Sequence, residues 1–148
     1  MARIHLVEGR LIPAPPARVH AVLADYHQGH RAILPACFET LRVEAGGFGE
    51  GTVIRYAVRL LGRRLETRAR ITEPEPGRKL VETDLGNGAT TTFHLDPEGP
   101  GTRVRIETEH HQPGLAGWVA ARLFPLLLRG VYREELENLA RLTDSASG

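Results

Sequence analysis

The segment after Pro113 carries one continuous amphipathic pattern, and this pattern restricts the fold more than any other feature of the sequence. Its apolar residues recur every three or four positions, the spacing at which side chains share one face of an α-helix. The stripe comprises Leu115, Trp118, Val119, Leu123, Leu126, Leu127, Leu128, Tyr132, Leu136 and Leu139. A helix this long needs a broad apolar surface to pack against, so we expect the rest of the chain to form one.

The preceding residues have the alternating pattern of β-strands. In 52–61, for example, Ile54 and Tyr56 alternate with Arg55 and Arg59, which is typical of a half-buried strand. Similar runs occupy 3–12, 39–45, 64–71, 79–85, 89–95 and 103–110, with turn residues such as Gly86-Asn87-Gly88 between them. Two short helical segments fit between Pro16 and Pro35.

These elements predict an α+β fold. We expect a curved seven-stranded antiparallel sheet wrapped around the long C-terminal helix, with two short helices between strands 1 and 2. We expect a single domain over residues 1–143 and a disordered tail over residues 144–148.

Composition and charge argue against nucleic-acid binding and membrane insertion. A net charge of +1 with 25% charged residues gives no global field for nucleic acid or a membrane surface. The most apolar stretch, 115–128, is too short to cross a bilayer and contains Arg122, so we expect no stable membrane insertion. The first residues lack the pattern of a signal peptide, and Cys37 is the only cysteine. We therefore expect a cytoplasmic protein without disulfides.

Several short motifs occur in a characteristic order along the chain. They are Ile12-Pro13-Ala14-Pro15, Val22-Leu23-Ala24-Asp25-Tyr26 followed by Leu34-Pro35, Gly49-Glu50-Gly51-Thr52, and the turn Glu73-Pro74-Glu75-Pro76-Gly77-Arg78. With the order of elements, they resemble the START-like, or Bet v 1-like (SRPBCC), superfamily, and more narrowly its polyketide cyclase/dehydrase and lipid-transport group. The resemblance implies a helix-grip fold around an internal hydrophobic cavity, in a superfamily that includes both carriers and enzymes.

His110 is the most notable polar residue. By strand alternation it points inward at the end of the last strand, beside Thr108 and near the start of the long helix. An imidazole in that position could orient a ligand carbonyl or act as a general acid or base. The alternative is a half-exposed histidine bonded to the backbone at a strand end.

Other inward-facing residues are candidates for the wall of the pocket. The complete set of expected ligand-binding residues is Tyr26, His30, Leu34, Tyr56, Thr91, Phe93, Thr108, His110, Trp118 and Arg122. Tyr56 and Trp118 each bring a polar edge to an apolar face, whereas Phe93 also fits plain core packing. Arg122 either offers its charge to an acidic ligand group or extends to solvent at the edge of the stripe.

Charged residues outside the predicted pocket suggest no cofactor. His27 and His30 have a permissible metal-ligand spacing, but they lack a carboxylate-rich partner motif, so we expect no metal and no cofactor. Outward-facing arginines on two strands form a basic stripe: Arg55, Arg59, Arg64, Arg68 and Arg70. Simple hairpin register places Arg70 near Glu82 and Arg68 near Asp84, and such cross-strand pairs would account for much of this stripe.

We expect the protein to bind or transport a small hydrophobic molecule, such as a lipid, polyketide or isoprenoid-like compound. This hypothesis depends on a predicted pocket with few ionisable groups. The first alternative is a polyketide cyclase or dehydratase-like enzyme that uses His110, Tyr56 and Arg122, since such cyclisation depends largely on positioning the substrate. The second is a protein-interaction module with a filled pocket. The sequence is compatible with a monomer or a homodimer.

Overall fold

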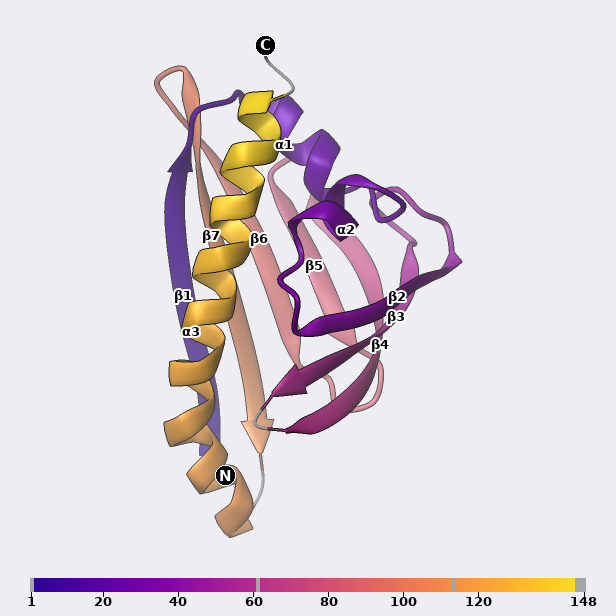
Figure 1. Cartoon of the computed structure of the whole chain (residues 1–148), viewed down its shortest axis with the longest axis vertical. Helices are drawn as coiled ribbons and strands as arrows, with labels where there is room; N and C mark the ends of the chain where they lie inside the picture. Colours follow the sequence, from indigo (N-terminus) through magenta and orange to yellow (C-terminus); the bar gives the residue numbers. More distant parts are fainter. Residues whose placement is uncertain (1, 61, 113, 146–148) are drawn as a thin grey trace.

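A seven-stranded antiparallel sheet and a long C-terminal helix make up most of the fold (Figure 1). The computed structural model describes residues 2–60, 62–112 and 114–145, and for residues 2, 3, 111, 112, 114–125 and 145 it describes the backbone alone. The elements are, in order, β1 (Ala2–Ile12), α1 (Pro16–Leu23), α2 (Gly29–Ile33), β2 (Phe38–Ala45), β3 (Val53–Leu60), β4 (Arg63–Glu75), β5 (Lys79–Asp84), β6 (Thr90–Glu98), β7 (Gly101–Gln112) and α3 (Gly114–Ser145).

The strand order is β1-β7-β6-β5-β4-β3-β2, so the first strand pairs with the last and only β1 leaves the sequential meander. The two short helices carry the chain from β1 at one edge of the sheet to β2 at the other. Helix α3 lies along the concave side, beside β1 and β7, and the curved strands β2 to β4 reach around the opposite side (Figure 1). The predicted helix-grip fold is thereby confirmed.

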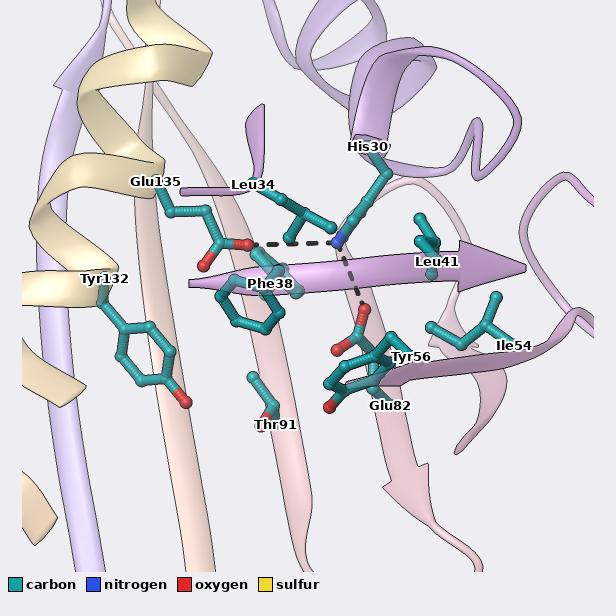
Figure 2. A pocket seen from close by; sticks show the side chains of 11 residues that line it. His30, Leu34, Phe38, Leu41, Ile54, Tyr56, Glu82, Thr91, Tyr132 and Glu135 are labelled. Atoms are coloured by element: carbon teal, nitrogen blue, oxygen red, sulfur yellow. Dashed lines mark ion pairs between the residues drawn. The ribbon is translucent and has the colours of Figure 1, made fainter. Parts of the chain in front are cut away.

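The pairing of β4 with β5 differs by one residue from the predicted register. Ile71 lies opposite Glu82, and Ala69 lies opposite Asp84. A shift of one residue moves a side chain to the other face of the sheet, so Glu82 points inward, as Ile71 does, instead of meeting Arg70 on the outer face (Figure 2). The predicted pairs of Arg70 with Glu82 and of Arg68 with Asp84 are therefore wrong.

Two of the outward arginines form ion pairs with glutamates of β2 instead. The Arg68 Nε atom lies 2.5 Å from Glu44 Oε1, and Arg59 Nε lies 3.1 Å from Glu39 Oε1. Both arginine side chains are more than half exposed, so these pairs add little to stability. These pairs neutralise part of the basic stripe on the outer face of the sheet.

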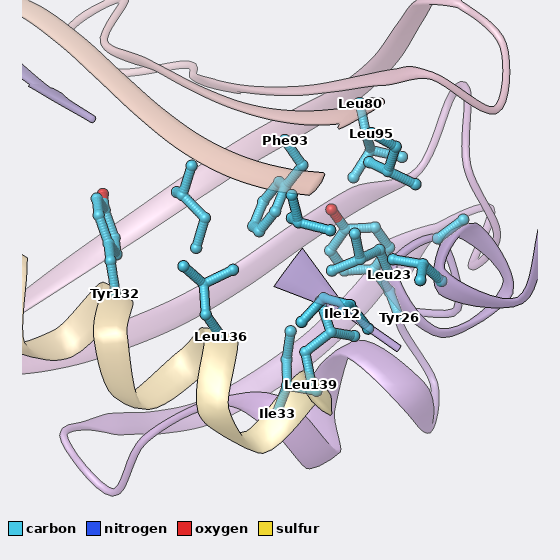
Figure 3. Close-up of a cluster of buried hydrophobic side chains, with 14 of the residues drawn as sticks. Ile12, Leu23, Tyr26, Ile33, Leu80, Phe93, Leu95, Tyr132, Leu136 and Leu139 are labelled. Carbon is cyan, nitrogen blue, oxygen red and sulfur yellow. The ribbon is translucent and has the colours of Figure 1, made fainter. Parts of the chain in front are cut away.

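The core lies between the second half of α3 and the inner face of the sheet (Figure 3). Leu136 and Leu139 of α3 are almost completely buried, as the helical stripe predicts, and they pack with Phe93 of β6 in one cluster. Leu126 departs from the predicted stripe because 71% of its surface is exposed. Within the described residues, no helix has the length and apolar character needed to span a membrane.

A loop at Gly46–Gly51 fixes the entry to β3. Gly49 has a φ of 60°, and an added Cβ there would collide with the Glu73 carboxylate. This carboxylate accepts a hydrogen bond from the Glu50 amide at 3.2 Å and lies 2.6 Å from His20 Nε2. Glycine is favoured because it tolerates the left-handed conformation and leaves room for the carboxylate. The loop, α1 and β4 are thus held together by one side chain.

Candidate functional site

A small cavity lies between the inner face of the sheet, α2 and α3 (Figure 2). Its volume is about 40 Å³. It is lined by His30, Leu34, Phe38, Leu41, Ile54, Tyr56, Glu82, Thr91, Phe93, Tyr132 and Glu135. A buried water needs at least about 10–15 Å³ of such space, so the cavity has room for a few water-sized groups.

The lining combines an apolar part with a cluster of polar groups. Leu34, Phe38, Leu41, Ile54 and Phe93 supply the apolar part. The polar groups come from α2, β3, β5, β6 and α3, so segments far apart in the sequence must fold before the cluster exists. Ligand sites commonly pair an apolar wall with a few polar groups that fix orientation.

His30 is the centre of the polar cluster. Its side chain is 2% exposed, and its ring stacks on Tyr26 with 4.3 Å between the ring centroids. The His30 Nδ1 atom lies 2.8 Å from the carbonyl oxygen of Leu23, so Nδ1 carries a proton and donates to it. The Nε2 atom is then directed to the cavity, where it meets two carboxyl groups.

These carboxyl groups approach His30 from two different elements, β5 and α3 (Figure 2). Glu82 of β5 places Oε2 3.4 Å from His30 Nε2, and Glu135 of α3 places Oε1 3.9 Å from it. The Tyr26 hydroxyl donates a 2.7 Å hydrogen bond to Glu82 Oε2. Burial raises the pKa of Glu135 well above its usual range, and the charge of Glu82 raises this pKa further. Buried groups with perturbed pKa values in a cavity are typical of functional sites.

Phenol hydroxyls complete the polar lining. Burial is the main cause that raises the pKa of Tyr56 far above normal and that of Tyr132 to about 12, so both stay neutral near pH 7. The Tyr132 hydroxyl lies 2.5 Å from Thr108 Oγ1, which in turn lies 3.0 Å from Thr91 Oγ1. The Tyr56 hydroxyl has no hydrogen-bond partner among the described residues, so it is available to a bound molecule.

Five of the residues expected to bind ligand line this cavity: His30, Leu34, Tyr56, Thr91 and Phe93. Tyr26 and Thr108 lie behind the lining, and each is hydrogen bonded to a residue in it. His110 lies one strand repeat beyond Thr108, opposite Ile4 of β1, and is half-buried outside the described lining. The side chains of Trp118 and Arg122 lie outside the described residues.

The expectation of a pocket with few ionisable groups is wrong, because the sequence analysis missed Glu82 and Glu135. Glu82 shares strand parity with Leu80, which is buried, and this parity was a usable signal for its inward direction. Glu135 lies three residues after Tyr132 and four before Leu139, within the apolar stripe of α3. Phe38, Leu41, Ile54 and Tyr132 also line the cavity but were not expected site residues.

The two histidines with metal-ligand spacing point in different directions. His30 is buried in the cavity wall, whereas His27 is exposed and its ring lies against Gly47. On the outer face, His5, Glu107 and Glu109 come close enough to share an ion. However, Glu107 is already hydrogen bonded to His5 at 2.8 Å and to His94 at 2.9 Å, and cross-strand pairing accounts for these contacts.

Solved structures with the same architecture cover nearly the whole chain. The solution structure of the KanY protein (ms6282) is 27% identical with a TM-score of 0.85, and the match covers 97% of this chain and 99% of KanY. The crystal structure of TTHA0849 from Thermus thermophilus is 24% identical with a TM-score of 0.79, at the same coverage. A START superfamily protein from Mycobacterium smegmatis is 11% identical with a TM-score of 0.73, and the match covers 96% of this chain and 98% of that protein.

The comparison with curated proteins gave no match. Residues 3–143 match the family described as polyketide cyclase/dehydrase and lipid transport, which is almost the full length of the chain. The short motifs in the first half of the sequence and the helix-grip architecture both agree with this match. The chain therefore belongs to the polyketide cyclase/dehydrase and lipid transport family.

Proposed function

We propose that the protein binds a small, mainly apolar molecule that carries one polar group, with the polar group inside the cavity beneath α3. The single observation that carries this proposal is the division of the cavity lining into an apolar part and a cluster around His30. Membership of a family named partly for lipid transport supports a hydrophobic ligand. The ligand class expected from the sequence, a small hydrophobic molecule, is retained. In addition, the ligand must carry a polar group that can bind to the cluster around His30.

The size of the cavity adds a condition. A volume of about 40 Å³ accepts a polar group and a few attached atoms, but not a whole lipid or polyketide. The rest of the ligand would have to displace apolar side chains of the lining, of which Leu34 and Phe38 flank the short connection between α2 and β2. Small rearrangements of this kind are common on binding.

Two measurements test this proposal. Binding of a neutral apolar dye such as Nile red is measured by fluorescence, and native mass spectrometry of the purified protein detects a co-purifying molecule. Replacement of Leu41, which is 6% exposed and lines the cavity, by phenylalanine should fill part of the space and weaken dye binding at least about tenfold. Leu65→Phe is the matched control, because Leu65 is 43% exposed and outside the lining. Absence of dye binding and of any co-purifying molecule would contradict the proposal, as would equal dye affinity in both variants.

A second candidate function is acid–base catalysis, and the buried pair of His30 and Glu135 favours it. An imidazole nitrogen near a carboxyl group with a raised pKa can accept a proton from one atom of a substrate while the carboxyl group donates to another. A cyclisation of the aldol type needs both steps. In this version His30 and Glu135, with Tyr56, take the roles that the sequence analysis gave to His110 and Tyr56.

Turnover of a synthetic poly-β-ketone chain measures this second function. Loss of a general acid or base lowers rates by about 10²–10⁴-fold, so His30→Ala should have an effect of this size while His110→Ala retains turnover. Unchanged turnover in His30→Ala would remove His30 from the reaction, and no turnover in the unmodified protein would contradict this second function.

A further inference from the structure

We propose that the polar group bound by His30, Glu82 and Glu135 is a protonated amine, so that the preferred ligands are apolar amines. The inference rests on the proposed function, because it specifies the ligand of the same cavity. It is carried by the arrangement of three hydrogen-bond acceptors around one small space.

Two carboxyl groups and one imidazole nitrogen lie around the same small space. His30 Nδ1 donates to the Leu23 carbonyl, so it is Nε2 that faces the cavity. Glu82 Oε2 and Glu135 Oε1 lie 3.4 Å and 3.9 Å from that nitrogen, which is longer than a good hydrogen bond. An ammonium group bound beside His30 has N–H groups that it can donate to these carboxyl groups.

The charge of the lining also favours a cation. Two carboxyl groups face the space, and the eleven described side chains of the lining include no lysine or arginine. An anionic head group would thus meet carboxyl groups without a strong cationic partner, and an unpaired buried charge is strongly unfavourable. An ammonium group, in contrast, can bind the Glu82 carboxylate and also the Glu135 carboxyl group once that group releases its proton.

The raised pKa of Glu135 agrees with this assignment and links binding to pH. Its neighbours with titratable groups come from four elements and from the segments that follow α1 and α2: His30 of α2, Tyr56 of β3, Glu82 of β5, Tyr132 of α3, Tyr26 and Cys37. A cation placed beside Glu135 lowers the pKa of its carboxyl group again. Amine binding should therefore release a proton and strengthen as pH rises, up to the pKa of the amine.

Space and shape are compatible with the same ligand. An ammonium group is close in size to a water molecule, so the cavity of about 40 Å³ admits it with the first atoms of its carbon chain. The adjoining side chains of Leu34, Leu41 and Ile54 provide apolar contacts for the rest of the molecule. The neutral Tyr56 hydroxyl offers one further acceptor or donor near the cluster.

Three ligands with one apolar body separate the alternatives: 2-(2-naphthyl)ethylamine, 2-(2-naphthyl)ethanol and 2-naphthylacetate. Their affinities are measured by isothermal titration calorimetry and by displacement of Nile red. We expect the amine to bind at least about tenfold more tightly than the alcohol, and the carboxylate to bind more weakly than both. Calorimetry in buffers of different ionisation enthalpy should show protons released with the amine alone.

Two isosteric variants locate the amine. Glu135→Gln and Glu82→Gln should each weaken amine binding about tenfold or more and so lower the ratio of amine affinity to alcohol affinity. Glu137→Gln is the matched control, since Glu137 lies on the same helix but is exposed. Thermal unfolding of each variant checks that the fold is retained. Should one glutamine variant fail to fold, the other still gives the comparison.

The outcomes distinguish this inference from the proposed function. If dye and all three ligands bind but the amine has no advantage, the cavity binds ligand and the amine assignment is overturned. The assignment is also overturned if the amine is preferred but neither glutamine variant reduces this preference, because the amine is then held elsewhere. If neither dye nor ligands bind, the proposed function itself fails.

Discussion

Replacement of Glu135 by glutamine should make the stability of the protein less dependent on pH. The Glu135 side chain is 4% exposed, and burial together with Glu82 raises the pKa of its carboxyl group above the usual range. In the unfolded chain the same carboxyl group titrates near pH 4.3. Between these two pKa values the native state holds a proton that the unfolded chain has lost.

The sign and the magnitude follow from this difference. The proton stabilises the native state fully below the unfolded-state pKa, and this contribution is lost as pH rises towards the higher folded-state pKa. Within that interval the free energy of unfolding falls by about 1.4 kcal/mol per pH unit. Each pH unit inside this interval therefore removes a noticeable share of the 5–15 kcal/mol that stabilises an ordinary domain. Glutamine has a similar shape and does not titrate, so the variant should escape this loss.

Urea denaturation of both proteins at half-unit steps from pH 4 to pH 8 measures the effect. The two free energies of unfolding should be similar near pH 4, and the variant should become progressively more stable as pH rises. Glu137→Gln, on the exposed side of the same helix, should follow the unmodified protein throughout. A constant difference between Glu135→Gln and the unmodified protein would refute a buried, neutral Glu135 in the native state.

Three further substitutions test the packing around the site. Phe93→Ala removes a ring that is 2% exposed and should cost about 3–5 kcal/mol in urea denaturation; a loss below 1 kcal/mol would contradict its place in the core. Tyr132→Phe removes a buried hydroxyl bonded to β7 and should cost about 1–2 kcal/mol without loss of the fold, and an unchanged stability would argue against that bond. Gly49→Ala should lower the melting temperature more than Gly88→Ala, because both have positive φ but only at Gly49 would the new Cβ displace Glu73; equal effects would leave backbone strain as the whole cause.

The fold was accessible from the sequence because two periodicities point to the same arrangement. Strand alternation and the helical stripe ending at Leu139 each define one apolar face, and only a curved sheet around the helix lets both be buried. These patterns depend on many residues, so single errors do not change the result. The exposed Leu126 is one such error, and it left the predicted architecture intact.

The site was less accessible because it depends on single residues. A shift of one residue between β4 and β5 was enough to place Glu82 on the outer face instead of inside. A glutamate within a helical stripe is usually assigned to solvent, so Glu135 was passed over although its position between Tyr132 and Leu139 places it inside. The contacts of these carboxyl groups with His30 join three elements that are far apart in the sequence. A local sequence pattern cannot predict contacts of this kind.

The pairing of β1 with β7 also governs when the cavity can form during synthesis. The register runs from Ala2 opposite Gln112 to Ile12 opposite Thr102, so the strand made first has its partner in the strand made last. Pairing over such separations is slow, since the loop between the two segments must be closed before any contact stabilises it. The ribosome therefore releases β1 long before the strand that protects its edge. The cavity becomes complete only after α3 has emerged and brought Glu135 to His30.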